Sequence, residues 1–185
     1  MTYRPITDMW FLARAKLKGG QKFYGSYPAG FPERARAFLG VSIDDPVLHV
    51  CGGKLRSYPY PHAIGPNDKT LDLDESLCPD YLQDARDPFP IIEGGWPAIL
   101  INPPYSKEDA KNYSIGGDKY PSPNLLLKNA LIVVRPGGRV GVLHYQLPSP
   151  PPEKIGFRTR FVASVDVVGG FNNRIRVFSV FEKSY

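Results

Sequence analysis

The stretch Ala98-Ile99-Leu100-Ile101-Asn102-Pro103-Pro104-Tyr105 constrains the fold more than any other part of the chain. Its four apolar residues predict a strand that is buried on both faces, as strands are inside a parallel sheet. Two prolines then end the strand, because neither has an N–H for the sheet ladder and each fixes its own φ. The chain is therefore rigid at the carboxyl end of a central strand, where open α/β sheets bind their ligands.

The residues Asn102-Pro103-Pro104-Tyr105 resemble the catalytic (Asp/Asn/Ser)-Pro-Pro-(Tyr/Phe/Trp) motif of S-adenosylmethionine-dependent amino-methyltransferases. Enzymes with this motif modify adenine N6, cytosine N4 or, in one branch, a glutamine side-chain amide. The resemblance implies an α/β, Rossmann-like class I methyltransferase fold, with a mostly parallel sheet of about seven strands and a C-terminal antiparallel hairpin. It also implies S-adenosyl-L-methionine as the cofactor.

The composition indicates a single globular domain. Of the 185 residues, 42% are hydrophobic and 22% charged, which suits one core but not two large ones. We expect residues 45–185 to form the methyltransferase domain, and residues 1–44, a basic and aromatic segment with a short helix, to pack on it. No apolar run approaches membrane-spanning length and no signal-peptide pattern follows Met1. Cys51 and Cys78 fit free thiols in a reducing cytoplasm.

Basic residues are concentrated at the two ends of the chain. Residues 1–40 carry seven Lys or Arg against two acids, residues 41–150 ten against thirteen, and residues 151–185 six against three. With a net charge of +5, this distribution predicts a surface that attracts phosphate backbones. A solvated basic surface is the alternative.

The N-terminal segment alternates cations with aromatic side chains, a pattern suited to tracking phosphates and stacking on bases. Alternatively, its aromatic residues cover the edge of the sheet and its lysines face water. We expect DNA as the partner, with RNA as an alternative, and a protein partner is a further candidate for target recognition. The candidate nucleic-acid contacts are Lys16, Lys18, Lys22, Tyr105 and Lys107.

The segment Val47–Gly53 predicts the strand and glycine turn that open a cofactor site. Without Cβ atoms, Gly52 and Gly53 let the backbone approach a ligand closely. The segment resembles the first methyltransferase motif, which implies that Cys51, Gly52 and Gly53 lie under the methionine part of the cofactor. Pro59 and Pro61 argue against a regular helix after this turn, so we expect a loop or a single turn.

Two acidic residues follow the next strands. Asp72, in Thr70–Asp74, is the first candidate to accept the ribose hydroxyls of the cofactor, with Asp74 as the alternative and otherwise a cap. Asp84, followed by Ala85, resembles the third motif, whose acid accepts the adenine amino group. About a dozen residues separate Asp72 from Asp84, so the second crossover is also short, and we expect reduced crossover helices.

Proline and glycine residues mark where the remaining predicted helices and strands begin and end. Helices are predicted over 31–40 and 122–134, with Ser122 as a cap. The turn 135–139 resembles the one that precedes the fifth strand of the methyltransferase fold, and 140–145 is that strand. Runs 160–168 and 174–182, joined by 169–173, predict a hairpin. The segment 106–117 predicts a polar turn and then a glycine-rich loop.

The chemistry implied by the motif is methyl transfer to a poorly nucleophilic amine. Asn102 Oδ1 and the Pro103 carbonyl can accept hydrogen bonds from both N–H bonds, while Pro103 and Pro104 hold these acceptors still. Tyr105 can stack on the base, and Asn102 also borders the cofactor. His49, His62 and His144 lack ligand spacing, so we expect no metal. His144 either faces the pocket or is a satisfied core histidine, which is the favoured interpretation.

The sequence therefore predicts an S-adenosylmethionine-dependent methyltransferase acting on adenine N6 in DNA. Cytosine N4 in DNA is a close alternative, because the same corner serves both bases, and adenine N6 in RNA is another. A protein glutamine-amide methyltransferase is a third. A non-catalytic nucleic-acid-binding subunit is a fourth, favoured by the short connection that follows Gly53.

Overall fold

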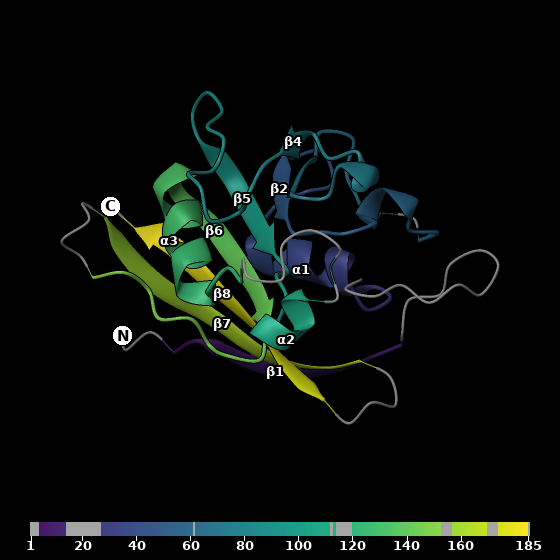
Figure 1. The fold of residues 1–185 in the computed structure, drawn as a ribbon. Helices are drawn as coiled ribbons and strands as arrows, with labels where there is room; N and C mark the ends of the chain where they lie inside the picture. Colours follow the sequence, from purple (N-terminus) through teal and green to yellow (C-terminus); the bar gives the residue numbers. More distant parts are fainter. Residues whose placement is uncertain are drawn as a thin grey trace.

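The protein has an α/β fold in a computed structural model that describes residues 4–13, 27–60, 62–111, 113, 120–152, 157–169 and 174–184 (Figure 1). The candidate contacts Lys16, Lys18 and Lys22 lie outside the described residues. The elements in chain order are β1 Ile6–Leu12, α1 Phe31–Leu39, β2 Val47–Val50, η1 Leu55–Ser57, β3 Lys69–Asp72, η2 Glu75–Leu77, β4 Tyr81–Leu82, β5 Trp96–Ile101, α2 Lys107–Ala110, α3 Pro123–Val133, β6 Val134–His144, β7 Arg158–Gly169 and β8 Ile175–Ser184.

A single mixed sheet runs through the molecule in the order β1-β7-β8-β6-β5-β2-β3-β4. All neighbouring strands are parallel except that β8 lies antiparallel to both β6 and β7. The expected C-terminal antiparallel hairpin is thus present. The expected number of about seven strands was too low, since the sheet has eight. The unexpected strand is β1, which pairs in parallel with β7, Ile6 opposite Ala163.

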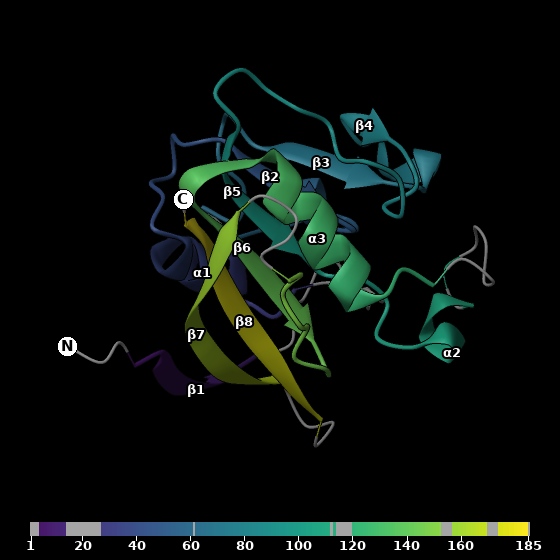
Figure 2. The same ribbon diagram turned by 90° about the vertical axis from the view of Figure 1, so that its left-hand side faces the viewer.

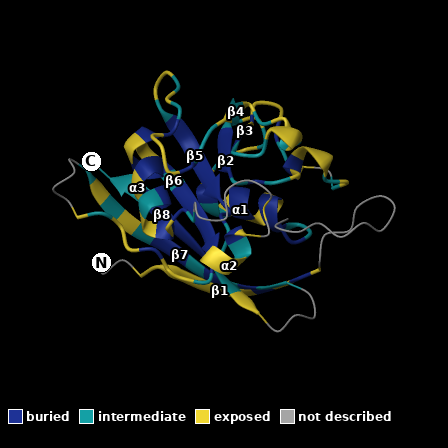
Figure 3. Ribbon diagram, viewed as in Figure 1, coloured by how far each residue is buried: buried dark blue, intermediate teal, exposed yellow. Residues whose placement is uncertain are grey.

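The sheet is covered on both faces, by α1 on one and by α3 on the other (Figure 2). Alternate residues of β5 point to opposite faces, so Leu100 packs in the core with α1 while Ile99 and Ile101 pack in the core with α3. The strands β2 and β5 are consequently buried throughout, and exposure increases toward β1 and β4 (Figure 3). This double coverage explains the uninterrupted apolar run that precedes Asn102.

The two long helices begin and end close to the predicted residues. Ser122 caps α3 by accepting the N–H of Leu125 at 3.3 Å, and α1 ends at Gly40 in the left-handed conformation. The start of β6 was predicted wrongly, at residue 140 instead of Val134. Gly138 allows the early start, because a Cβ there would lie 2.8 Å from the carbonyl oxygen of Pro97. In place of the turn expected at 135–139, the pairing of β5 with β6 shifts its register between Trp96 and Ala98.

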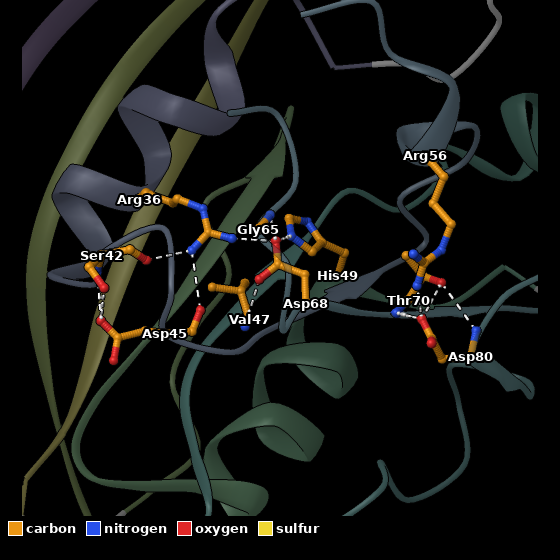
Figure 4. Close-up of polar contacts among 10 residues, drawn as sticks. All are labelled: Arg36, Ser42, Asp45, Val47, His49, Arg56, Gly65, Asp68, Thr70 and Asp80. Atoms are coloured by element: carbon orange, nitrogen blue, oxygen red, sulfur yellow. Dashed lines mark hydrogen bonds and ion pairs between the residues drawn. The ribbon is translucent and has the colours of Figure 1, made fainter. Parts of the chain in front are cut away.

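Among the described residues, the regular structure in the connections after β2 and β3 is limited to the single 3₁₀ turns η1 and η2, in line with the expected short crossovers. A buried carboxylate, Asp68, holds the first connection (Figure 4). It accepts hydrogen bonds from Arg36 of α1, from His49 Nε2 of β2 at 3.0 Å and from the N–H groups of Val47 and Gly65 at 3.0 and 2.7 Å. One side chain therefore joins α1, β2 and the chain that leads into β3.

A second carboxylate, Asp80, secures η1 and the start of β4 (Figure 4). It pairs with Arg56 of η1 and accepts the N–H and Oγ1–H of Thr70 at 2.8 and 3.1 Å. Lys69 Nζ lies 3.4 Å from its other oxygen. Asp68 and Asp80 with their hydrogen-bond and ion-pair partners form two polar clamps. These clamps connect strands that longer crossover helices connect in a doubly wound sheet.

Candidate active site

The sheet ladder continues past the carboxyl ends of β2, β3 and β5, and this places the predicted site residues side by side. The N–H of Cys51 donates to the carbonyl of Leu71 at 2.9 Å, and the N–H of Asn102 donates to the carbonyl of Val50 at 3.0 Å. The N–H of Gln83 donates to the carbonyl of Asp72 at 3.0 Å. The structure therefore brings the glycine turn, Asp72 and the Asn-Pro-Pro-Tyr corner to one rim of the sheet.

The turn after β2 has an unusual backbone. Cys51 and Gly53 both have positive φ, 55° and 58°, the left-handed region that suits glycine and is uncommon for cysteine. Burial raises the pKa of the Cys51 thiol well above its usual value, and the charges of Asp72 and Asp84 raise it further. The thiol is therefore protonated at neutral pH, and its surroundings show that both carboxylates lie near the turn.

Asp72 is half-buried at the end of β3. Burial raises the pKa of its carboxyl group, while backbone N–H groups of Asp74, Gly53 and Leu73 partly counter that shift. The bond from Asp74 N to Asp72 Oδ1 is 3.2 Å long. Asp74 instead caps η2 and accepts the N–H of Ser76 at 2.9 Å. The geometry favours Asp72 over Asp74 as the acceptor that faces the glycine turn.

Asp84 lies two residues beyond β4, beside the buried Ala85. Its carboxylate accepts hydrogen bonds from Arg86: Nη2 to Oδ2 at 2.7 Å, Nε to Oδ1 at 3.1 Å and the backbone N to Oδ1 at 2.9 Å. The sequence prediction missed Arg86. An arginine two residues after an acid in a turn is the only sequence signal for this pair.

The Asn-Pro-Pro-Tyr corner is largely buried. Asn102 is only 5% exposed, and its Oδ1 accepts a hydrogen bond from the Tyr105 hydroxyl at 2.9 Å. The amide predicted to hold the substrate amine is thus fixed by the last residue of its own motif. Burial and this bond together give the acceptor a defined orientation before any substrate binds.

The ring of Tyr105 lies in a cluster of aromatic and cationic side chains. Its centroid is 4.6 Å from that of Tyr145 and 5.6 Å from that of His144, and Arg176 Cζ lies 5.1 Å above the ring. The prediction missed Tyr145 and Arg176. Because β8 is antiparallel to β6, its first residues reach the same rim as the last residues of β6. Only the pairing of the strands reveals this proximity.

His144 is the satisfied core histidine that the sequence favoured. It is fully buried; its Nδ1 accepts the N–H of Gln146 at 2.9 Å, and its Nε2 lies 3.2 Å from the Tyr120 hydroxyl. Burial lowers the pKa of His144. A neutral imidazole thus packs edge to face against the ring of Tyr105.

No protein-family model and no curated protein sequence matches the chain. Similar solved structures include TrmN from Thermus thermophilus (21% identity, TM-score 0.55, covering 86% of this chain and 50% of that one). A Burkholderia thailandensis 1,6-didemethyltoxoflavin-N1-methyltransferase with bound S-adenosylhomocysteine is another (15%, 0.54, 83% and 76%). A Listeria monocytogenes protein assigned to the class I S-adenosylmethionine-dependent methyltransferases is a third (10%, 0.52, 91% and 64%). The chain has an α/β methyltransferase fold.

The chain spans half the length of TrmN, and similarity at these sequence identities shows the fold alone.

Lys107 is exposed in α2, just beyond the corner, where Ser106 caps the helix by accepting the N–H of Asp109 at 3.0 Å. Within the described part of the chain, no three His, Cys, Asp or Glu side chains are arranged to hold a metal ion. No helix there is long and apolar enough to cross a membrane.

Proposed function

We propose that this chain transfers a methyl group from S-adenosylmethionine to the N6 amino group of adenine in DNA. The observation that carries the proposal is the convergence of the Cys51–Gly53 turn, Asp72, Asp84 and the Asn102–Tyr105 corner at one rim of the sheet. The methyltransferase fold supports the methyl transfer, and the resemblance of the corner to amino-methyltransferases supports an amino group as the acceptor.

The rim offers a group for each part of the cofactor. The Cys51–Gly53 turn presents backbone to the methionine part, and the Asp72 carboxylate can accept hydrogen bonds from both ribose hydroxyls. Asp84 is assigned to the adenine amino group, which would share the carboxylate with its present donor Arg86. The bound cofactor would supply a sulfonium methyl group to a nitrogen nucleophile.

The corner residues act on the substrate amine. Asn102 Oδ1 can accept an N–H from the amine in addition to the Tyr105 hydroxyl, because an amide oxygen has two lone pairs. The Pro103 carbonyl can accept the second N–H. Two such bonds shift lone-pair density onto the nitrogen, and the fixed acceptors need little reorganisation during reaction.

A non-catalytic nucleic-acid-binding subunit is the second candidate. The observation that favours it is that two predicted ligand acceptors already have partners within the protein: Asp84 pairs with Arg86, and Asn102 with Tyr105. Titration calorimetry with S-adenosylhomocysteine distinguishes the candidates. Binding supports the enzyme, whereas no binding at millimolar concentration supports the subunit.

The deciding experiment for the substrate is incubation with S-adenosylmethionine and DNA, followed by nucleoside mass spectrometry. N6-methyladenine that is absent with an Asn102→Ala variant supports the proposal. Parallel incubations with RNA and with glutamine-containing peptide test the alternatives, as does N4-methylcytosine in the DNA. A methylated product found only in one of these arms would replace adenine in DNA as the substrate.

A further inference from the structure

A hollow of about 180 Å³ lies between the beginning of α1 and the segment that follows η1. This segment belongs to the connection between β2 and β3, where the sequence predicted a loop in place of a crossover helix. The proposed reaction assigns it no role. The residues that line the hollow and matter here are Pro28, Pro32, Glu33, Tyr58, Tyr60 and His62.

The walls of the hollow are aromatic and held in place. The rings of Tyr58 and Tyr60 are 6.2 Å apart and tilted by 38°, and the Tyr58 hydroxyl donates to the carbonyl of Tyr27 at 3.0 Å. His62 has a φ of 66°, a strained conformation for a side chain that is not glycine, of the kind that gathers at ligand sites. The volume is below that of pockets for drug-sized ligands and suits one planar ring system.

The hollow adjoins the candidate active site. Gly169 lies between the two, because a Cβ there would be 3.2 Å from Arg176 Nη1 and 3.7 Å from Pro28 Cγ. Pro28 lines the hollow, while Arg176 lies over the ring of Tyr105. A guanidinium therefore lies beside both the corner and Gly169, which borders Pro28 of the hollow, and this position suits the phosphate that links two nucleotides.

We propose that this hollow binds the base of a DNA nucleotide adjacent to the target, an inference that rests on the proposed function. Tyr60 provides the stacking surface, and Arg176 contacts the intervening phosphate. Glu33 is exposed at the rim; its carboxylate would repel a phosphate but can accept hydrogen bonds from an exocyclic amino group. The hollow therefore selects adenine, cytosine or guanine over thymine.

The test measures binding and does not depend on catalysis. The whole chain is titrated into fluorescein-labelled single-stranded DNA by anisotropy, with saturating S-adenosylhomocysteine to occupy any cofactor site. An abasic residue is placed in turn at each position beside the target adenine. An abasic residue at one position is expected to reduce affinity by about 5- to 150-fold, the effect of losing one base–aromatic stack.

A double-mutant cycle with Tyr60→Leu assigns that position to the hollow. The variant and the abasic site should each weaken binding, and together no more than either alone, while Tyr60→Phe should retain affinity and confirms that the ring acts by stacking. Additive losses, or no position-dependent loss, would overturn the proposal. Failure of methyl transfer with an intact cycle would overturn only the proposed reaction.

Base selection tests the role of Glu33. Glu33→Gln should reduce the preference for an amino-bearing base over thymine at the sensitive position, whereas Glu93→Gln, an exposed acid in the turn before β5, should leave it unchanged. Equal preference in the wild type, or equal effects of both variants, would contradict the assignment. Affinity for a proline-rich peptide that competes with DNA for the Tyr60 site would identify a different occupant and sink the proposal.

Discussion

At the scale of single residues, the proposed acceptors of the candidate site already accept hydrogen bonds from neighbouring side chains. Tyr105 donates to Asn102 Oδ1 and Arg86 donates to the Asp84 carboxylate. Such bonds fix the direction of an acceptor before the ligand arrives, which lowers the reorganisation needed at reaction. The motif residues were predictable from the sequence because proline marks the corner. The hydrogen bond between Tyr105 and Asn102 within that motif was not predicted, and the only signal for the Asp84–Arg86 pair is an arginine two residues after an acid.

Tyr105→Phe tests this orientation without removing the ring. The variant keeps the contacts with Tyr145 and Arg176 but loses the hydroxyl that donates to Asn102. We expect the rate of methyl transfer to fall by about 2- to 13-fold, the effect of one net hydrogen bond of roughly 0.5–1.5 kcal/mol. Single-turnover kinetics measure the rate and calorimetry the cofactor affinity, which should not change. Loss of affinity with an unchanged rate would contradict a positioning role.

At the scale of secondary structure, two carboxylates replace much of what crossover helices provide in a doubly wound sheet. Asp68 connects α1, β2 and the entry to β3, while Asp80 connects η1, β3 and β4. The sequence predicted the short turns, because prolines at positions 59 and 61 prevent a helix. It did not predict the clamps, since Asp68 stands in a Pro-Asn-Asp-Lys run typical of a turn, and its partners are 19 and 32 residues away.

Asp68→Ala should destabilise the fold far more than Asp80→Ala. The Asp68 side chain is fully buried and its loss leaves Arg36 buried without a counter-charge, which costs about 3–5 kcal/mol. Asp80 is 22% exposed and its cationic partners are nearly half exposed, so its ion pairs contribute roughly 0–1 kcal/mol. Urea unfolding of both variants measures the difference. Equal losses of unfolding free energy would show that the buried interactions of Asp68 stabilise the fold no more than the exposed ion pairs of Asp80.

Acid should weaken the fold through His49. Burial lowers the pKa of His49 although Asp68 favours its charged form, so the neutral imidazole donates from Nε2 to Asp68. As pH falls below about 6.5, the unfolded chain binds a proton that the folded chain resists, and the free energy of unfolding decreases by up to about 1.4 kcal/mol per pH unit.

His49→Gln provides the comparison for this pH dependence. It removes the titrating group and should flatten the slope of unfolding free energy between about pH 6.5 and 5. Some slope should remain, because burial also lowers the pKa of His144. Asp68 acts in a lower range: burial raises the pKa of its carboxyl, but hydrogen bonds from His49, Arg36 and Gly65 outweigh burial and lower it, so its contribution is lost only below about pH 3.9. An unchanged slope in His49→Gln would exclude the histidine as its source.

At the scale of the whole molecule, the strands that carry the candidate site were far more predictable than the edge of the sheet. Each cofactor-side strand ends at a glycine, an acid or a proline, so its carboxyl end is visible in the sequence. The strand β1 carries no such mark, and only its pairing with β7 identifies it, with Ile6 opposite Ala163, 157 residues later in the chain. Of the two interpretations of the N-terminal segment, covering the sheet edge holds for Trp10, while the lysines at 16, 18 and 22 lie outside the described residues.

Because β1 lies at the edge of the sheet, replacing its two adjacent aromatic residues should change stability by very different amounts. Trp10 is 5% exposed, with its ring 5.3 Å from that of Phe38 and 6.0 Å from that of Phe178, and its Nε1 donates to Asp8 at 2.8 Å. Phe11 points away from this core and is 77% exposed. Trp10→Ala should cost about 3–5 kcal/mol by leaving a cavity, whereas Phe11→Ala should stay within about 0.5 kcal/mol. Thermal and urea unfolding compare the two; similar small losses would mean that β1 does not contribute to the core, and a sheet of seven strands would then suffice for stability.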